Sequence, residues 1–317
     1  MSRPGAGGAD DPWRLADIPD QDGRTVVVTG TTLGGLGHHT ALELARRGAR
    51  VVLAGRTPAR LEETAGQIRS EVPAARLERL EVDLADLASV RRAGETATAY
   101  GPVDVLVNNA GVMGTRRATT VDGLDLQMAT NHWGPFLLTG LLLPQLLAST
   151  DGRVVTVSSI MHRSATSAPL GDPRGQGLLY RRWLVYGQTK LANLLFTHEL
   201  DRRARAKDLP LRALAAHPGF AGTHLAANGQ YGRSAGGVAT ILDASIKAVS
   251  QPAAHGAWPV LMAATADLPG ATFVGPGGLG EMGGTPQVVT SSRLAQDQEA
   301  QRLLWELSEE TTGISYP

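Results

Sequence analysis

Residues Thr25 to Arg47 read TVVVTGTTLGGLGHHTALELARR. This stretch opens with the β-branched run Val26–Val28, passes through a glycine-dense turn, and closes on an amphipathic helical pattern with Leu42 and Leu44 on its inward face. A strand that leads through a glycine turn into a helix leaves several backbone N–H groups pointing at one place, and the helix dipole adds positive charge there. Glycine is needed because a side chain would hold a phosphate away from the backbone. The stretch therefore predicts a phosphate-binding turn.

Strand and helix patterns alternate along the rest of the chain. Several of the strands are apolar throughout, as strands buried on both faces are. Alternation with helices longer than ten residues predicts right-handed βαβ units. We therefore expect an α/β fold, with a single-domain, doubly wound parallel sheet of the Rossmann type and helices on both faces. Strands are expected at 25–29, 50–54, 76–82, 103–108, 153–158 and 211–216, and helices at about 36–47, 58–71, 86–99, 122–147, 183–206 and 291–311.

The chain is expected to form one domain. Residues 1–22 are rich in Gly, Pro and Asp, which is typical of a flexible N-terminal arm. Residues 23–317 would then form a single domain without an internal linker. Two long, polar, glycine- and proline-containing segments, at about 160–182 and 222–250, interrupt the alternation. Such loops lie beyond the carboxyl ends of the strands, where ligands bind, so we expect them to select the substrate.

Composition excludes several classes of function. The 30 basic and 30 acidic residues cancel, which argues against a nucleic-acid or anionic-membrane partner. The chain has no cysteine, so disulfides, thiolate nucleophiles and cysteine-ligated zinc are excluded. We find no signal peptide and no apolar stretch long enough to span a bilayer, so a soluble, cytoplasmic protein is expected.

Arg56 indicates which nucleotide the turn would bind. It follows the second expected strand, where an NAD-binding protein carries an acidic residue for the ribose 2′-hydroxyl. A guanidinium at this position suits a 2′-phosphate instead. NADP(H) is therefore favoured over NAD(H), although NAD(H) stays possible.

Tyr186 and Lys190 are the candidate reacting pair. They lie four residues apart on an expected helix (YGQTK), so their side chains share one face. An ammonium beside the phenol would stabilise the phenolate and lower the tyrosine pKa toward the working range. Ser159 follows the fifth expected strand, where its hydroxyl could bind a carbonyl oxygen.

The order of these motifs resembles the short-chain dehydrogenase/reductase family, and within it the retinol-dehydrogenase-like branch. The resemblance covers residues 23 to 312 or so. It rests on TGTTLGGLG (29–37), NNAG (108–111), Asn131-His132, Val157-Ser158-Ser159, YGQTK (186–190) and HPGFAGT (217–223).

The resemblance implies roles for particular residues. Tyr186 would be the catalytic acid/base, Ser159 would orient the carbonyl, and Lys190 would hold the nicotinamide ribose. Asn131 would support a proton-relay water near Lys190. The cofactor-binding residues implied by the motifs are Gly30, Thr32, Leu33, Gly35, Leu36, Gly37, Arg56, Asp83, Leu84, Asn109, Ala110, Gly111, Tyr186, Lys190, Pro218, Gly219 and Thr223.

The glycine turn departs from the family's usual TGxxxGxG pattern. Here Gly37 comes one residue late, giving TGxxxxGxG with Gly35 and Gly37 as the last two glycines. A surplus residue looped out before Gly35 would leave the phosphate site intact. The next residues, His38 and His39, lack metal-ligand spacing and are expected to be exposed in the first helical turn, and we expect no metal site. His162 and Arg163, just after Ser159, are candidates for the substrate pocket.

Three alternatives stay open from the sequence. Gly232–Gly236 reads GRSAG and matches the nucleophile elbow of serine hydrolases, but no expected strand precedes it. An extended-type sugar epimerase or dehydratase would need a larger C-terminal substrate domain than the chain offers after HPG. A non-catalytic NADP-binding protein would not need Ser159, Tyr186 and Lys190 together.

The favoured function is an NADP(H)-dependent oxidoreductase that interconverts an alcohol and a carbonyl. The loops contain Leu170, Leu178, Leu179, Trp183, Leu225 and Tyr231, which favours an apolar or aromatic small molecule as the substrate. The helices at 122–147 and 183–206 are apolar enough to pair between subunits, so a homodimer or homotetramer is possible.

Overall fold

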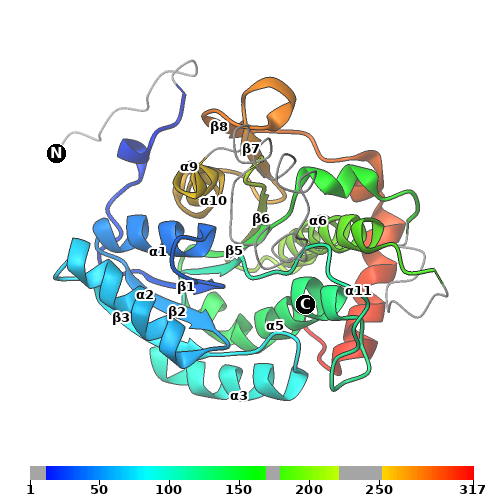
Figure 1. The fold of residues 1–317 in the computed structure, drawn as a ribbon, viewed down its shortest axis with the longest axis horizontal. Helices are drawn as coiled ribbons and strands as arrows, with labels where there is room; N and C mark the ends of the chain where they lie inside the picture. Colours follow the sequence, from blue (N-terminus) through cyan, green and yellow to red (C-terminus); the bar gives the residue numbers. More distant parts are fainter. Residues whose placement is uncertain (1–11, 169–178, 221–251) are drawn as a thin grey trace, which may run out of the picture.

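The computed structural model describes residues 12–168, 179–220 and 252–317, and Figure 1 shows their arrangement. One eight-stranded sheet runs through the molecule in the order β3-β2-β1-β4-β5-β6-β7-β8. Every neighbouring pair is parallel except β7 with β8. The strands are β1 (Thr25–Thr29), β2 (Arg50–Gly55), β3 (Arg76–Glu81), β4 (Val105–Asn108), β5 (Gly152–Val157), β6 (Leu211–Ala216), β7 (Phe273–Pro276) and β8 (Pro286–Val288).

Helices connect the strands and cover both faces of the sheet. In Figure 1, α3 and α5 lie on one side of the sheet, and α1 lies with α10 on the other. The α-helices are α1 (Leu36–Arg46), α2 (Pro58–Glu71), α3 (Leu87–Ala97), α4 (Leu126–Met128), α5 (Gly134–Leu147), α6 (Arg182–Ala206), α9 (Ala253–Gly256), α10 (Trp258–Thr265) and α11 (Gln298–Thr312). The expected doubly wound α/β fold is confirmed.

Alternate residues of a central strand pack into two separate hydrophobic cores, one on each face of the sheet. Val26 and Val28 of β1 pack into a cluster with α1, α2 and α10. Val27, between them, packs into the opposite cluster with α3, α5 and α6. Both faces of such a strand are buried, which explains why its sequence is continuously apolar rather than alternating.

The N-terminal segment differs from the expected loose arm within its described part. Residues 12–22 include the short 3₁₀ turn η1 (Leu15–Asp17). Ile18 is 1% exposed and belongs to the core cluster on the α1 side, against which Trp13 also packs. The Gln21 N–H donates to the Arg47 carbonyl oxygen. These few apolar residues among Pro and Asp give no periodic pattern, so only the tertiary contacts show that they belong to the domain.

Four elements after β6 carried no recognised sequence signal. Strand β7 reads FVGP and β8 reads PQV, and both are too short and too rich in Gly or Pro to show a strand pattern. Helices α9 and α10 are also short. The expected helix at 122–147 is divided, because a π-helical turn, η3 (Ala129–Trp133), separates α4 from α5.

Two sequence expectations fall largely outside the described residues. The loop at 222–250 lies there entirely, with Thr223 and the GRSAG motif, and the loop at 160–182 lies there in part. In the described part of the chain, the apolar helices are all too short to cross a membrane.

Candidate active site and nucleotide cavity

The glycine turn lies between β1 and α1, at the carboxyl edge of the sheet. Gly30 has φ +73°, and a Cβ there would lie 2.7 Å from the Ala110 Cα atom. Gly35 is the N-cap of α1. A Cβ on Gly37 would lie 2.6 Å from both the Gly30 carbonyl oxygen and the Asn109 Nδ2 atom. The turn therefore packs so closely on the helix and on the β4 loop that both positions require glycine.

The surplus residue of the glycine turn is accommodated before Gly35. Gly35 and Gly37 stand at the start of α1, and Gly34 has φ +75°, a left-handed conformation that suits glycine. The Gly34 N–H donates to His38 Nδ1 at 3.2 Å. The leading N–H groups of α1 have no intrahelical acceptor, so they are available to bind an anion at the helix start.

His38 is therefore not the exposed residue that we expected. Its side chain is buried, and burial lowers its pKa to about 4. His39 is half-buried, and burial also lowers its pKa. A neutral His38 can accept the Gly34 hydrogen bond, so the residue braces the longer turn.

A cavity of about 480 Å³ opens in front of this turn. Ten of the expected cofactor residues line it: Gly30, Thr32, Gly35, Leu36, Arg56, Asp83, Leu84, Asn109, Ala110 and Gly111. Its wall also contains Thr29, Thr31, Ala54, Gly55, Thr57, Arg60, Leu61, Val82, Val112, Met113, Thr115, Leu126 and Thr130, which we did not single out from the sequence. The remaining expected residues do not line this cavity where they are described: Leu33, Gly37, Tyr186, Lys190, Pro218 and Gly219.

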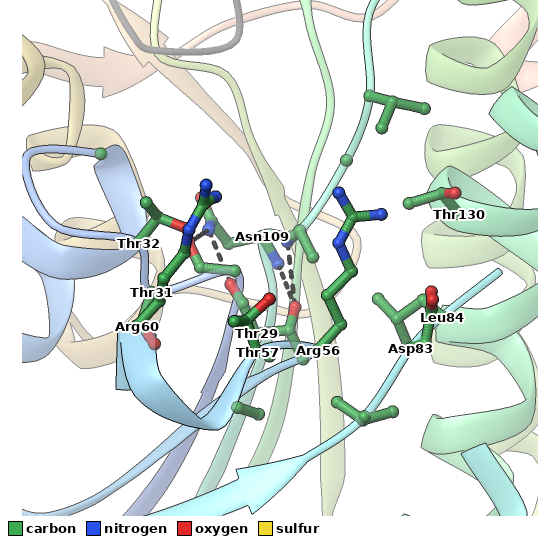
Figure 2. A pocket seen from close by; sticks show the side chains of 18 of the residues that line it. Thr29, Thr31, Thr32, Arg56, Thr57, Arg60, Asp83, Leu84, Asn109 and Thr130 are labelled. Carbon is green, nitrogen blue, oxygen red and sulfur yellow. Dashed lines mark hydrogen bonds between the residues drawn. The ribbon is translucent and has the colours of Figure 1, made fainter. Parts of the chain in front are cut away.

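Two arginines border the cavity at the β2–α2 connection. Arg56 follows β2, and Arg60 lies in the first turn of α2, so both exposed guanidinium groups are available to one ligand. Figure 2 shows them extending in the same general direction, with Asp83 and Leu84 across from Arg56. Arg60 lies only four residues after Arg56, just inside the helix that follows the second strand, which is the sequence signal that could have indicated it.

Asn109 braces the turn as well as lining the cavity. Its Nδ2 atom donates to the Thr29 carbonyl oxygen at 2.7 Å and to the Gly30 carbonyl oxygen at 3.2 Å. The Thr31 carbonyl oxygen accepts from the Thr64 hydroxyl of α2 at 2.9 Å. The turn is thus held by side chains from two neighbouring elements, and Figure 2 shows Asn109 directed at it.

The shape and chemistry of this cavity suit a dinucleotide. The cavity offers helix N–H groups for a pyrophosphate, two cations, and small residues that leave room for a ring system.

Tyr186 and Lys190 lie at the Gly111 end of the cavity. A Cβ on Gly111 would lie 3.0 Å from Asn131 Oδ1 and 3.7 Å from Lys190 Nζ, so these two side chains back the cavity wall. Lys190 Nζ donates to the Val157 carbonyl oxygen at 2.9 Å and stands 5.7 Å from the centre of the Tyr186 ring. The Ser158 hydroxyl donates to the Lys190 carbonyl oxygen at 2.7 Å, which ties α6 to the end of β5.

Burial controls the ionisation of both members of the pair. It raises the pKa of Tyr186 to about 12, and a hydrogen bond with the Ser159 side chain acts in the opposite direction. It lowers the pKa of Lys190 to about 8. The raised tyrosine pKa is opposite to our expectation, because removing the phenolate from water outweighs what a neighbouring cation offers. The tyrosine is therefore protonated at neutral pH.

Asn131 lies in the π-helical turn η3. Its Oδ1 atom accepts from the Val112 N–H at 2.8 Å, and its Nδ2 atom donates to the Val112 carbonyl oxygen at 2.9 Å and to Thr189 Oγ1 at 2.9 Å. The side chain therefore connects the loop after β4 to α6, where it bonds to Thr189, the residue before Lys190. Such π-helical turns are frequent at functional sites.

Ser159 is the N-cap of the 3₁₀ turn η4 (Ile160–Ser164), and its Oγ accepts from the Met161 N–H at 3.2 Å. The His162 side chain belongs to the same turn. It is fully buried, its Nδ1 lies 2.7 Å from the Ser159 carbonyl oxygen, and its Nε2 accepts from the Ser292 N–H at 3.1 Å. The residue holds the turn that begins at Ser159.

The structure thus brings Ser159, Tyr186, Lys190 and Asn131 together at one end of the cavity. Arg56, Asp83 and Leu84 lie along the same cavity. Pro218 and Gly219 follow β6, at the same carboxyl edge of the sheet, and Gly219 has φ +66°.

Comparisons with known proteins agree with this arrangement. Residues 24–170 match the family model described as short chain dehydrogenase. Retinol dehydrogenase 13 of Homo sapiens is 37% identical over 95% of this chain and 87% of its own length. Polyprenol dehydrogenase of Mus musculus is 39% identical over 95% of this chain and 87% of its own length.

Two solved structures extend the comparison. An uncharacterized protein from Mycobacterium paratuberculosis is 44% identical, has a TM-score of 0.79, and matches over 97% of this chain and all of that one. A protein described as an NAD(P)-dependent gluconate 5-dehydrogenase from Beutenbergia cavernae, with bound NADP, is 26% identical with a TM-score of 0.59, over 78% of this chain and 92% of that one.

The fold, the motifs and the extent of these similarities lead to one assignment. The chain belongs to the short-chain dehydrogenase/reductase family, in its retinol-dehydrogenase-like branch, and is an oxidoreductase that uses a nicotinamide cofactor.

Proposed function

We propose that this protein is an NADP(H)-dependent oxidoreductase that interconverts an alcohol and a carbonyl on an apolar small molecule, with Tyr186 as the acid/base. The observation that carries the proposal is the position of the buried Tyr186–Lys190 pair, whose ammonium backs the cavity wall at Gly111. A proton donor next to an ammonium that lies directly behind the nucleotide cavity suits hydride transfer coupled to proton transfer.

Arg56 and Arg60 support the preference for NADP(H). Both line the cavity where β2 gives way to α2, and none of the described lining residues from 54 to 61 is acidic. A 2′-phosphate carries two negative charges that two guanidinium groups can bind with charge-assisted hydrogen bonds. The solved relative described with bound NADP is consistent with this choice.

The proton chemistry follows from the burial of the pair. Tyr186 is protonated at neutral pH and can donate to the oxygen of a carbonyl, while its Ser159 hydrogen bond stabilises the phenolate that remains. Lys190 keeps its charge below about pH 8 and stands beside the ring that becomes negative. A nicotinamide bound in this cavity would supply or accept the hydride. In the reverse direction, the phenolate accepts the alcohol proton.

An apolar substrate is supported by the surroundings of Tyr186 and by the named relatives. The Trp183 ring stands edge-on to the Tyr186 ring at 6.3 Å between centres, and it packs on Gly114, where a Cβ would lie 2.9 Å from the indole. Two relatives are named for retinol and for polyprenol, both apolar alcohols. We therefore place apolar primary alcohols and their aldehydes first among the candidates.

Turnover of NADPH with a panel of apolar aldehydes and ketones tests the proposal. We expect reduction by the wild-type protein and a fall in kcat of roughly 10²- to 10⁴-fold in Tyr186→Phe, with NADPH affinity retained. Tyr100→Phe is the matched control, because the Tyr100 hydroxyl donates to the Arg79 carbonyl oxygen outside the cavity. NADPH binding without any turnover would instead identify a non-catalytic NADP-binding protein.

A further inference from the structure

Glu281 joins two loops that flank the proposed active site. It lies in the connection between β7 and β8, and its side chain is 20% exposed. Its Oε2 atom is 3.0 Å from His217 Nε2, and its Oε1 atom accepts from Arg163 Nη2 at 2.7 Å. Neither the sequence motifs nor the family resemblance drew attention to this residue.

The two partners of Glu281 belong to segments with assigned roles. Arg163 lies in η4, the turn that starts directly after Ser159. His217 follows β6 and begins the His217–Gly219 turn expected at the nicotinamide end. One carboxylate therefore ties the carbonyl-orienting turn after β5 to the cofactor-side turn after β6.

The hydrogen bonds of His217 define its tautomer. Nδ1 accepts from the Gly219 N–H at 3.2 Å, so the ring proton must be on Nε2, which donates to the Glu281 carboxylate. Burial lowers the pKa of His217 to about 4, so the ring carries a single proton at neutral pH. Glu281 thereby selects the tautomer that can hold Gly219.

Gly275 and Phe273 pack closely against the His217 ring. A Cβ on Gly275 would lie 2.1 Å from His217 Nε2, and the Phe273 ring centre is 5.1 Å away. Contacts of the backbone reinforce the same geometry, since the Phe220 N–H donates to the Met282 carbonyl oxygen at 2.8 Å. Glu281 itself has φ +58°, a conformation that non-glycine residues adopt only where their surroundings hold them.

Residues 290–292, which follow β8, contact η4 at two further points. Arg163 Nη2 also donates to the Thr290 carbonyl oxygen at 3.2 Å, and the Ser292 N–H donates to His162. The segment from Glu281 to Ser292 therefore contacts both η4 and the turn after β6, and the Glu281 side chain bonds to a residue of each.

We propose that Glu281 is a positioning residue for the reaction, which holds the Ser159 turn through Arg163 and the Pro218–Gly219 turn through the tautomer of His217. The expected effect on the reaction rate rests on the proposed function, whereas the effect of Glu281 on the His217 tautomer does not depend on it. Misplacing a reacting group by a fraction of an ångström is sufficient to lower a rate substantially.

Substitutions at Glu281 and Arg163 test this role. In Glu281→Gln, His217 and Arg163 both need an acceptor, but the amide offers one oxygen, so the tautomer should become mixed. In Arg163→Met the carboxylate remains for His217. In the double variant the amide oxygen is free to face His217, so the tautomer should be restored. Leu279→Ala, in the same loop and 96% exposed, is the control.

Long-range nitrogen–proton NMR spectra of histidine-labelled protein report the tautomer, with His217→Gln used for assignment. We expect the Nε2–H form in the wild type, in Arg163→Met, in Leu279→Ala and in the double variant, and a mixture in Glu281→Gln. With an accepted carbonyl, kcat/KM should fall about tenfold or more in Glu281→Gln. It should recover only in part in the double variant, which restores the His217 tautomer but lacks the Arg163 contact with the Ser159 turn.

Several results would overturn the inference. An unchanged tautomer in Glu281→Gln, or a double variant no better than Glu281→Gln, would show that the carboxylate does not act through His217. A lower melting temperature as the only change in Glu281→Gln would assign it a purely structural role. If the wild type reduces no carbonyl, the proposed function fails, whereas the tautomer measurements still decide the inference.

Discussion

At the scale of single residues, burial decides the chemistry of Tyr186 and Lys190. Desolvation favours the neutral form of each, so it raises the tyrosine pKa to about 12 and lowers the lysine pKa to about 8. The carboxyl end of β5 supplies their polar contacts, since Val157 O accepts from Lys190 Nζ and from Asn193 Nδ2. A protonated phenol held beside an ammonium is suited to carbonyl reduction.

Arg60 gives a residue-scale prediction about the cofactor. We expect Arg56→Ala and Arg60→Ala each to weaken NADPH binding by roughly 10- to 100-fold, since a hydrogen bond to a charged group contributes about 1.5–3 kcal/mol. NADH binding should change little, because it lacks the 2′-phosphate. Titration of both nucleotides by calorimetry provides the comparison.

Arg69→Ala is the matched control for this pair. Arg69 lies on the same helix, is 45% exposed on its side chain, and is 4.0 Å from Glu62. It does not line the cavity. Equal losses of NADPH and NADH affinity in the Arg56 and Arg60 variants would contradict the assignment of the 2′-phosphate site.

At the scale of elements, the turn from β1 into α1 depends on close packing. Gly37 lies against the Gly30 carbonyl oxygen and Asn109, and Gly30 lies against Ala110. His38 and Asn109 then bind backbone groups of the turn. The surplus residue is tolerated because these contacts hold both ends of the turn while Leu33 and Gly34 stay off the cavity wall.

Gly37→Ala tests this packing. The added methyl group would lie 2.6 Å from a backbone oxygen and must displace α1 or the turn, so we expect a loss of about 1–3 kcal/mol in the free energy of unfolding and weaker NADPH binding. Denaturant unfolding and nucleotide titration measure the two effects.

Gly66→Ala should have the opposite effect on the free energy of unfolding. Gly66 of α2 is exposed, and nothing lies within 4 Å of a Cβ there. Gly66→Ala should therefore stabilise the protein by about 0.5–1 kcal/mol through its higher helix propensity. If both alanines had the same effect, packing at the turn would not be what requires Gly37.

At the scale of the whole molecule, buried histidines couple stability to pH. Burial lowers the pKa of His132 to about 3, and those of His38 and His217 to about 4, from the ordinary 6.5. Below pH 6.5 the unfolded chain takes up protons that the folded protein does not, so the free energy of unfolding falls as the pH is lowered toward 4. Each such group contributes a slope of up to about 1.4 kcal/mol per pH unit.

His132→Leu should reduce this slope. His132 is 1% exposed, and its Nε2 lies 2.9 Å from Ser308 Oγ of α11, so the leucine removes one titrating group from the core. Urea unfolding at several pH values between 7 and 4 gives the slope independently of the stability at neutral pH. The exposed Leu279 provides the control, because Leu279→Ala removes no titrating group and should leave the slope unchanged. An unaltered slope in His132→Leu would show that His132 is not neutral in the folded state.

The sequence alone determined the central sheet and the spacing of the Tyr186–Lys190 pair. The strand expected at 25–29 and that at 211–216 have the observed bounds, because strands buried on both faces are mostly apolar along their length. Tyr186 and Lys190 share one face of α6 because of their helical spacing, and the glycine turn is recognised from its own residues. Both signals are local in the sequence.

The tertiary structure alone decided how those residues behave. Burial of Tyr186, the packing of residues 12–22, and the contact of Glu281 with two loops all depend on segments far apart in the chain. Strands β7 and β8 exist because a neighbouring strand offers hydrogen bonds, although their own sequences do not favour a strand. Local patterns specify elements and spacing, whereas solvation and long-range contacts, which set pKa values and loop positions, arise only when the elements pack together.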